Sequence, residues 1–374
     1  MSGIYIHIPF CRKKCFYCDF YTIVNSLKKD DFLNALQKEI KQRKDYLGNS
    51  EVSTIYFGGG SPSILMEKDI QGILNEIIKY FKIKEKVEIT LEANPDDLNF
   101  TYLSSLRKMG INRLSIGIQS FNNKHLKFLG RRHDSKKAKN SINESVSAGF
   151  DNISLDLIYG FQGLTHKEWE ITLDEALSHS IQHISAYHLS IEPKTLFFRR
   201  LEQGKLKEIS EGNSLKQYET LFVKLKEKNL MQYEISSFAI PGYESQHNSN
   251  YWKPKKYVGF GPSAHSYNLE SRQWNISDVN TYVQELKGEH LPCTIEKLGE
   301  KTKFNEFIMT SLRTVEGINL PELCQHFNEF YINHVKNTFE RIKSDQFIKD
   351  SNFIRLTTKG LFISDRIIQE FMLV

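Results

Sequence analysis

Long apolar runs, targeting signals and repeats are all missing from this sequence. The longest apolar stretches have the length of strands, so no segment fits a transmembrane helix, which needs about 20 apolar residues. The N-terminal apolar run has neither a basic region before it nor a small-residue cleavage site, which argues against a signal peptide. No internal repeat or low-complexity segment is visible. We therefore expect a globular protein without a membrane span.

A strong excess of charge of one sign is also absent. The 374 residues include 50 Lys and Arg and 45 Asp and Glu, which leaves a net charge of +5. This excess is small for the length and does not indicate binding to nucleic acid. Hydrophobic residues make up 40% and aromatic residues 12%, enough for a substantial core in two domains, or in one large domain and a smaller one.

Cysteine is scarce and unevenly placed. There are five cysteines, and three of them, Cys11, Cys15 and Cys18, fall within eight residues. An odd number with this crowding argues against a disulfide framework and favours a reducing cytoplasm. Cys293 and Cys324 stand apart, and the position of Cys324 on an apolar helix face predicts a core residue.

The cysteine triplet has the spacing C-x3-C-x2-C and directly follows a predicted strand. A cubane [4Fe–4S] cluster normally takes four thiolates, so three thiolates leave one iron open to an exchangeable chelating ligand. Three cysteines with a histidine such as His7 are also an accepted zinc set, and spacing alone leaves this alternative open. A catalytic cysteine is less favoured, because three at metal-like spacing would be redundant.

The first two-thirds of the chain alternates strand and helix signals. The predicted strands are Ile4–Ile8, Thr54–Phe57, Val87–Leu91, Arg113–Ile118, Ile153–Ile158 and His183–Leu189. The predicted helices are Asp31–Arg43, Glu67–Phe81, Thr101–Met109, Ser135–Ala148 and Lys167–Ser178. Six βα-type units imply a parallel sheet with right-handed crossovers, whereas an eight-stranded barrel would need two more. We expect an α/β fold, a partial (β/α)6 barrel with its ligand site at the C-terminal ends of the strands.

The pattern loosens after about Gly204. A helix over Ser214–Lys228, a strand over Tyr233–Phe238 and a polar, aromatic-rich stretch over Gly242–Trp274 are expected next. Further on, the predicted helices are Asn305–Leu312, Leu320–Phe327, Asn333–Lys343 and Lys359–Glu370, with strands over Gln346–Ile348 and Phe353–Leu356. Three helices with a β-hairpin resemble a winged-helix module. Its basic residues are interleaved with acids, so we expect a lid or a partner surface rather than a DNA-binding face.

We accordingly predict three segments. Residues 1–204 form the barrel, residues 205–300 form an extension associated with it, and residues 301–374 form a mostly helical, winged-helix-like C-terminal domain.

Residues suited to ligand binding follow several predicted strands. The run Gly58-Gly59-Gly60-Ser61-Pro62 can expose backbone N–H donors to a ligand, with a simple tight turn as the alternative. Glu92 ends the third strand, where a carboxylate can accept hydrogen bonds from a ribose or an ammonium group or lie on the surface. Asp156 lies inside an apolar run and needs a polar partner, which favours a functional role. Arg131 can pair with a carboxylate or remain solvated.

The cysteine spacing, with an aromatic residue before the last cysteine, resembles the radical SAM superfamily. Motifs at the ends of the predicted strands narrow the resemblance to one part of the superfamily. These motifs are Y-I-H-I-P-F-C, Y-F-G-G-G-S-P-S, L-E-A-N-P, L-S-I-G-I-Q-S-F, L-G-R-R-H and L-D-L-I-Y-G. Together they resemble the family of oxygen-independent coproporphyrinogen III oxidase and the HemW heme chaperones, from Gly3 to about Tyr267 and more weakly beyond.

The resemblance implies a [4Fe–4S] cluster on the three cysteines, with S-adenosylmethionine (SAM) at the open iron. The reaction class that it implies is reductive cleavage of SAM to a 5′-deoxyadenosyl radical. It assigns SAM contacts to Tyr5, Tyr17, Gly59, Gly60, Ser61, Glu92, Gln119, Arg131 and Asp156.

Two differences between this chain and the oxidases help to decide which of the two related groups the chain resembles more. The oxidase motif carries a further cysteine where this chain has Phe20, and the oxidase has a long extension before its cluster loop, whereas here the first cysteine is residue 11. Both features resemble the chaperones, as does the motif H-N-x-x-Y-W at His247–Trp252. His247 offers an axial ligand to heme iron and the aromatics offer flat apolar area, with a loop anchored by its aromatics as the alternative.

Other histidines are weaker candidates for a heme ligand. His265 is the second candidate, and His7, His183 and His188 are expected to be core or barrel-lining residues.

The expected function is that of a heme chaperone that binds heme, the cluster and SAM and delivers heme to an acceptor protein. The expected electron donor is a flavodoxin or ferredoxin, and no nucleic acid is expected as a partner. Oxidase activity in porphyrin biosynthesis is the alternative function.

Overall fold

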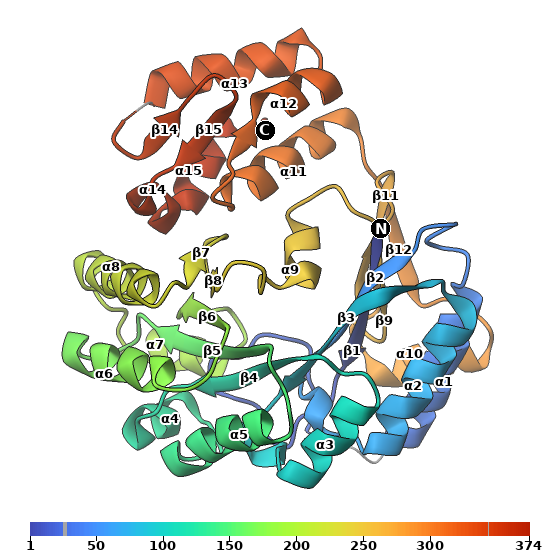
Figure 1. Ribbon diagram of the computed structural model, residues 1–374. Coiled ribbons are helices and arrows are strands. Elements are labelled where there is room, and N and C mark those ends of the chain that lie inside the picture. Colours follow the sequence, from blue (N-terminus) through green and yellow to red (C-terminus); the bar gives the residue numbers. More distant parts are fainter. Residues whose placement is uncertain (25–27, 343) are drawn as a thin grey trace.

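The centre of the computed structural model is one sheet ordered β12-β11-β10-β9-β1-β2-β3-β4-β5-β6-β8-β7 (Figure 1). The structure describes residues 1–24, 28–342 and 344–374. The two ends of the sheet, β12 and β7, do not pair with each other within these ranges. The fold is therefore an open barrel, which confirms the predicted architecture.

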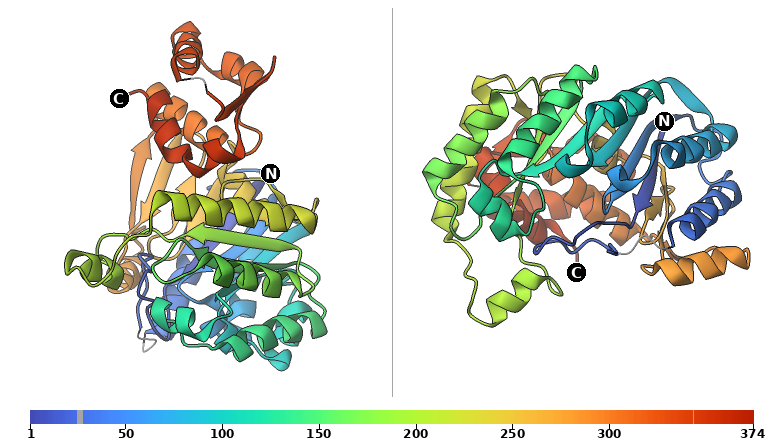
Figure 2. Two further views of the ribbon diagram at one scale, coloured as in Figure 1. Left: turned by 90° about the vertical axis from the view of Figure 1, so that its left-hand side faces the viewer. Right: turned by 90° about the horizontal axis from the view of Figure 1, so that it is seen from below.

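Strands and helices alternate through the first half of the chain, with the helices on the outer face of the sheet (Figures 1 and 2). These elements are β1 (Ser2–Ile8), α1 (Lys29–Gln42), β2 (Val52–Gly59), α2 (Glu67–Tyr80), β3 (Ile83–Ala93), α3 (Phe100–Lys108), β4 (Arg113–Gln119), α4 (Asn123–Leu129), α5 (Ser135–Ser147), β5 (Ile153–Tyr159), α6 (His166–Leu177) and β6 (His183–His188). Strands β1 to β6 pair in parallel, each with the next. All six predicted strands and five predicted helices are confirmed with shifted ends, whereas α4 was not predicted.

The two faces of the parallel strands differ in chemistry. In β1, Ile4, Ile6 and Ile8 are fully buried in the apolar core. The alternate residues Tyr5 and His7 point into the barrel, where the Tyr5 hydroxyl lies 3.1 Å from His7 Nδ1. The barrel interior is therefore polar, and it continues into the site at the strand ends.

Further strands extend the sheet on both sides: β9 (Tyr257–Phe260) pairs in parallel with β1, and the remaining added strands pair antiparallel with their neighbours. After α7 (Leu196–Glu202) and α8 (Glu211–Glu227), β7 (Met231–Gln232) and β8 (Ser237–Ala239) follow β6 at one edge. The single strand predicted over Tyr233–Phe238 is thus wrong, since most of it connects β7 and β8. At the other edge lie β9 (Tyr257–Phe260), β10 (His265–Tyr267), β11 (Ser271–Asn275) and β12 (Cys293–Lys297). Helix α9 (Gln246–Tyr251) packs against β1 and β2, and α10 (Val279–Lys287) packs against α1.

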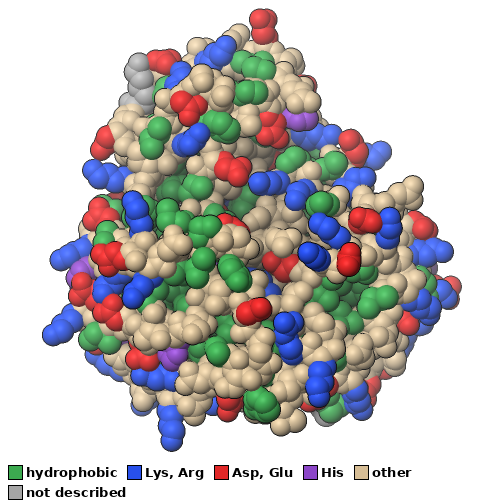
Figure 3. All heavy atoms as spheres, in the orientation of Figure 1, with side chains coloured by type: hydrophobic (Ala, Val, Ile, Leu, Met, Phe, Trp, Pro, Cys, Tyr) green, Lys and Arg blue, Asp and Glu red, His purple; other side chains and the backbone are tan. Residues whose placement is uncertain are grey.

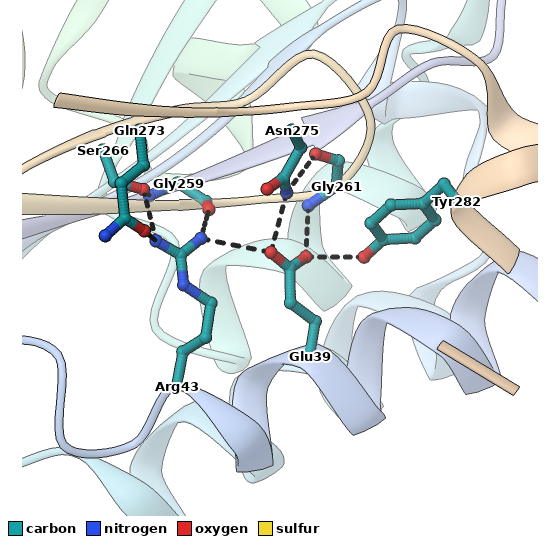
Figure 4. A network of polar contacts seen from close by, with 8 residues as sticks. All are labelled: Glu39, Arg43, Gly259, Gly261, Ser266, Gln273, Asn275 and Tyr282. Carbon is teal, nitrogen blue, oxygen red and sulfur yellow. Dashed lines mark hydrogen bonds and ion pairs between the residues drawn. The ribbon is translucent and has the colours of Figure 1, made fainter. Parts of the chain in front are cut away.

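A buried polar network ties α1 to this second edge (Figure 4). Glu39 and Arg43 pair at 3.2 Å with both side chains almost fully buried. Glu39 also accepts from Tyr282 Oη at 2.6 Å and from the Gly261 N–H at 2.8 Å. Arg43 donates to the Gly259 carbonyl at 2.9 Å. Because a buried charge needs partners, the network joins α1 firmly to residues far along the chain.

The C-terminal module has its own apolar core, built from residues between Phe304 and Phe371. It comprises α11 (Glu300–Leu312), β13 (Ile318–Asn319), α12 (Leu320–His326), α13 (Glu329–Ile342), β14 (Phe347–Lys349), β15 (Phe353–Leu356), α14 (Thr358–Phe362) and α15 (Ser364–Phe371). Helices followed by a hairpin confirm the winged-helix-like order, although the predicted helix Lys359–Glu370 is interrupted at Ile363. Lys343, the predicted end of another helix, lies outside the described residues.

Several basic side chains of the C-terminal module are paired with acids. Arg341 lies 2.9 Å from Glu370, and Arg355 lies 3.1 Å from Asp350. Positive and negative side chains are interspersed on the face shown in Figure 3. Cys324 is exposed, so its predicted place in a core is wrong. The predicted boundaries of the three segments remain a prediction.

Candidate functional site

A cavity of about 410 Å³ opens at the C-terminal ends of the parallel strands. Most of the predicted site residues line it, namely Cys11, Cys15, Tyr17, Cys18, Gly59, Gly60, Ser61, Glu92, Gln119, Arg131 and Asp156. Tyr5 and His247 are the two predicted residues that do not. No residue of the C-terminal module that the structure describes lines this cavity, so the module does not form a lid over it here.

The cysteine loop is held to the barrel by its backbone. The Cys11 N–H donates to the Ile23 carbonyl at 2.9 Å. Phe16 donates to the Leu129 carbonyl at 3.2 Å and accepts from the Phe197 N–H at 3.0 Å. These bonds fix the loop at both ends and in the middle, so the three thiols are carried to one wall of the cavity.

The three thiols are only partly buried and unpaired with one another. Burial raises the pKa of Cys11, and that of Cys18 to about 11. Arg131 approaches Cys15, with its guanidinium 3.4 Å from the sulfur. Coordination to a metal deprotonates a thiol, and a cation beside the sulfur stabilises the resulting charge.

The zinc alternative finds little support in the geometry. Among the described residues, no three His, Cys, Asp or Glu side chains are arranged to hold a single metal ion. His7, the candidate fourth ligand, is engaged at both ring nitrogens, by the Tyr5 hydroxyl and by the Tyr21 carbonyl at 3.0 Å. It does not line the cavity.

The glycine run after β2 forms a second wall that only glycine can provide. Gly59 has φ +107, and a Cβ there would lie 2.7 Å from the His7 ring. A Cβ on Gly60 would lie 2.7 Å from the Phe10 carbonyl oxygen and 3.1 Å from the Cys11 sulfur. The run is thus a tight turn and also a cavity wall, packed against the first cysteine.

Two carboxylates reach the cavity from the barrel interior. Glu92 accepts from Tyr56 Oη at 2.8 Å and from the Gly59 N–H at 3.2 Å. Asp156 accepts from Ser115 Oγ at 3.1 Å. Burial raises the pKa of Glu92 to about 7 and that of Asp156 to about 6. Displaced carboxyl pKa values in a cavity are typical of functional sites.

Arg131 is bound within the wall and is not a solvated residue. Its guanidinium donates to the Gly117 carbonyl at 2.7 Å and to the Asn94 side chain. Asn94 in turn donates to Ser61 Oγ. Asn94 belongs to the L-E-A-N-P motif but was not predicted as a site residue, although it connects the glycine wall to Arg131. The buried Nε of Arg131 has no hydrogen-bond partner among the described residues.

Gln119 ends β4 in a strained conformation. It is buried, lines the cavity and has φ +66, which is unusual for a residue with a side chain. Such strain persists where the surroundings enforce it and is common at binding sites. Tyr17, between the second and third cysteines in the chain, also lines the cavity, and its burial raises its pKa.

His247 lies near the N-terminal end of the barrel, away from the cysteine cavity. Its Nδ1 is 2.9 Å from Thr54 Oγ1, and its Nε2 is 2.9 Å from Tyr251 Oη. Glu88 accepts the N–H of Gln246 at 3.0 Å and the N–H of His247 at 2.9 Å, which holds α9 in place. The ring is 1% exposed and burial lowers its pKa to about 3.

Tyr5 lies between these two regions. Its ring stacks on Tyr56 with centroids 6.1 Å apart and on His247 at 6.3 Å. It therefore supports the residues beneath the cavity without lining it. His265, the second heme-ligand candidate, is exposed on β10 and stacks on Trp274.

Comparison with solved structures identifies a full-length structural relative. Coproporphyrinogen III oxidase (HemN) from Escherichia coli, described as a radical SAM enzyme, matches with a TM-score of 0.86 and 23% identity. The match covers 99% of this chain and 89% of that chain. At this identity the likeness establishes the fold.

Sequence comparisons identify the family. The model of the radical SAM superfamily matches residues 5–176. The heme chaperone HemW of Bacillus subtilis is 32% identical over 100% of this chain and 99% of its own length. HemW of Lactococcus lactis is 31% identical, over 100% and 97% respectively. The chain therefore belongs to the HemW heme chaperone family of the radical SAM superfamily.

Proposed function

We propose that the protein is a heme chaperone that carries a [4Fe–4S] cluster, binds SAM beside it and delivers heme to an acceptor protein. The observation that carries the proposal is the convergence of three thiols, a glycine wall, two carboxylates and an arginine on one cavity. Full-length similarity to heme chaperones supports the same function.

The residues of the cavity fit a cluster with one open iron. Cys11, Cys15 and Cys18 would hold three irons through their thiolates. When bound, the cluster and SAM supply a reductively generated 5′-deoxyadenosyl radical. The expected one-electron donor is a flavodoxin or ferredoxin, which fits the proposed cytoplasmic location. Among the described residues, no helix has both the length and the apolar character to cross a bilayer.

The other cavity residues would orient SAM. Glu92 and Asp156 can accept hydrogen bonds from ammonium or hydroxyl groups, and the Gly59–Gly60 backbone lets a ligand lie close. Arg131 is already bonded to Asn94, Gly117 and Cys15, so its chief role here is to hold the wall. Its Nε, which has no hydrogen-bond partner among the described residues, is available to donate a hydrogen bond to the SAM carboxylate.

Heme ligation by His247 stays a prediction that this conformation does not favour. Both ring nitrogens are bonded inside the barrel, so ligation would require α9 to move. The heme-binding part of the proposal therefore stands without this residue.

Hemin titration of the purified, cluster-loaded protein tests the proposal. We expect a saturable Soret change at one hemin per chain, followed by transfer to an apo-heme protein. Hemin that stays unbound at micromolar concentrations would refute the chaperone function.

The shared fold with the oxidase makes decarboxylation of coproporphyrinogen III the second candidate. An anaerobic assay with SAM and a reductant separates the two. Formation of protoporphyrinogen would establish the oxidase, and its absence together with hemin binding would leave the chaperone.

A further inference from the structure

Two short segments of the chain carry its entire net positive charge. Residues 11–20 and 194–205 together contain seven Lys and Arg and two Asp and Glu, an excess of +5, which equals the net charge of the whole chain. One of the seven, Arg12, is paired with Asp97 at 3.1 Å. The other six form a surface that we call the basic face, namely Lys13, Lys14, Lys194, Arg199, Arg200 and Lys205.

The two segments of the basic face lie side by side, since α7 projects from the barrel next to the cysteine loop (Figure 2). The Phe197 N–H donates to the Phe16 carbonyl at 3.0 Å, and the two rings pack with centroids 6.3 Å apart. Lys13 Nζ lies 5.5 Å from the centre of the Phe16 ring, and Arg200 Cζ lies 4.8 Å from it. Phe16 directly follows Cys15, so one aromatic ring holds a cation from each segment beside the cysteines.

The fold does not neutralise the basic face. Among the described residues, no carboxylate forms an ion pair with any of its six cations, and all of them except the half-buried Arg200 are exposed. Nearby acids are already engaged, because Asp97 pairs with Arg12 and Asp96 pairs with Arg132 at 3.4 Å. Unpaired cations gathered on one surface attract a negatively charged partner and speed its approach.

Apolar side chains are exposed next to these cations. Phe20, two residues after Cys18, is 64% exposed, and Leu196 at the start of α7 is 39% exposed. Phe20 lines the rim of the cysteine cavity together with Lys13 and Lys14. Apolar residues surrounded by charged ones are typical of protein interfaces. The basic face therefore suits an acidic protein better than a small anion, which would leave the apolar side chains uncovered.

The basic face includes the loop that would carry the cluster. Lys13 and Lys14 stand between Cys11 and Cys15 in the chain, and their side chains are exposed whereas the thiols are partly buried. A protein docked on these lysines is separated from the cluster by little more than the loop itself. Such a short separation is what electron transfer between two proteins requires.

We propose that the basic face is the docking site of the protein that reduces the cluster, a small one-electron carrier with acidic side chains around its redox centre. The inference rests on the proposed function and assigns a surface to its expected flavodoxin or ferredoxin. In the transfer the carrier is oxidised by one electron, and the bound cluster is reduced by that electron from its 2+ to its 1+ state. The cations steer the carrier to the loop, and Phe20 and Leu196 pack against it.

Charge reversal outside the cavity tests the assignment. The double variant Arg199→Glu with Lys205→Glu changes two exposed residues that do not line the cysteine cavity. With the full-length, cluster-loaded chain, we expect the dissociation constant for oxidised flavodoxin, measured by calorimetry, to rise more than about tenfold. The rate of cluster reduction by reduced flavodoxin, followed by stopped-flow absorbance at low salt, should fall by a similar factor and depend less on salt.

A matched control removes the same charge from the opposite end of the barrel. Lys86→Glu with Lys108→Glu changes exposed lysines near the start of β3 and at the end of α3. This variant should keep the affinity and the reduction rate of the unmodified chain. Photoreduced deazaflavin, which is small and uncharged, should reduce the cluster equally fast in all three proteins, because it needs no docking surface.

The outcomes separate the docking site from the proposed function. Equal flavodoxin affinity and reduction rate in the two double variants overturn the assignment, as does a cluster that deazaflavin reduces and flavodoxin does not. Loss of binding to phosphatidylglycerol vesicles in Arg199→Glu with Lys205→Glu, with flavodoxin reduction unchanged, also overturns it and assigns the basic face to a lipid surface. Absence of hemin binding in the unmodified chain overturns the chaperone function alone.

Discussion

The imidazole of His247 stacks on the ring of Tyr56 with centroids 5.0 Å apart, and Tyr56 donates a 2.8 Å hydrogen bond to Glu92. This contact joins the helix that carries the H-N-x-x-Y-W motif to a carboxylate in the cysteine cavity. The two ends of the barrel are thus connected through one tyrosine.

We expect Glu92 to make the stability of the ligand-free protein depend on pH. Its pKa is about 7 in the folded protein against 4.5 for an ordinary glutamate, so between these values the folded state retains a proton that the unfolded chain releases. The free energy of unfolding should therefore fall as pH rises from about 4.5 to about 7, by at most about 3 kcal/mol. Asp156, with a pKa of about 6, adds to the slope.

Denaturant unfolding at several pH values measures this slope. Glu92→Gln should reduce the slope of the unfolding free energy against pH and leave only the part due to Asp156. The control, Glu227→Gln at the exposed end of α8, should leave the slope unchanged. An unchanged slope in Glu92→Gln would show that Glu92 titrates normally.

Substitution of a cavity cysteine should abolish the cluster. We expect Cys15→Ser, reconstituted anaerobically with iron and sulfide, to lose the brown chromophore, because two thiolates do not retain the cubane. The exposed Cys324→Ser is the control and should keep it. EPR of the reduced protein with and without SAM gives the second readout. A colourless unmodified protein that contains zinc alone would contradict the prediction.

Loss of His247 should destabilise the barrel. His247→Ala leaves Thr54 Oγ1 and Tyr251 Oη without this partner and opens a cavity beneath Tyr56. We expect a loss of about 2–4 kcal/mol in the free energy of unfolding, measured by denaturant titration. His290→Ala, on an exposed side chain, is the control and should change the free energy of unfolding by less than about 0.5 kcal/mol. Equal stability of the two variants would argue that α9 is loosely held.

The buried ion pair of Glu39 and Arg43 (Figure 4) gives a stability test with a larger expected effect. Glu39→Ala leaves Arg43 charged and buried, which should cost about 3–5 kcal/mol. Asp31→Ala, on the same helix, removes only an exposed pair with Lys287 at 3.4 Å and should cost less than about 1 kcal/mol. Comparable losses in both variants would mean that solvent reaches Arg43.

The parallel part of the barrel was predictable because its signals are local. Apolar runs such as Ile153–Ile158 mark strands that are buried on both faces, and the motifs at their ends marked most of the cavity. The edge of the sheet beyond β1 was not predictable, because β9 to β11 are short and carry polar residues such as Asn275. Asn275 is buried with its amide donating to Glu39, 236 residues earlier in the chain, and to the Gly261 carbonyl.

The location of His247 could not be read from its motif either. The sequence shows a histidine beside two aromatics, which suits a heme pocket and an anchored loop equally. Only the long-range contact with Thr54 and the capping by Glu88 place it inside the barrel. For His188 the local signal was sufficient, since the strand histidine expected to be a core or barrel-lining residue ends β6 and lines the cavity at the barrel mouth.

The Glu39–Arg43 network also determines when the protein can finish folding. Helix α1 follows the cysteine loop directly, yet its buried charges find their partners 216 to 243 residues later in the chain. A nascent chain that has not yet released Tyr282 from the ribosome still exposes these charges to water. The buried charges of α1 can therefore be fully paired only after the chain has been synthesised beyond Tyr282.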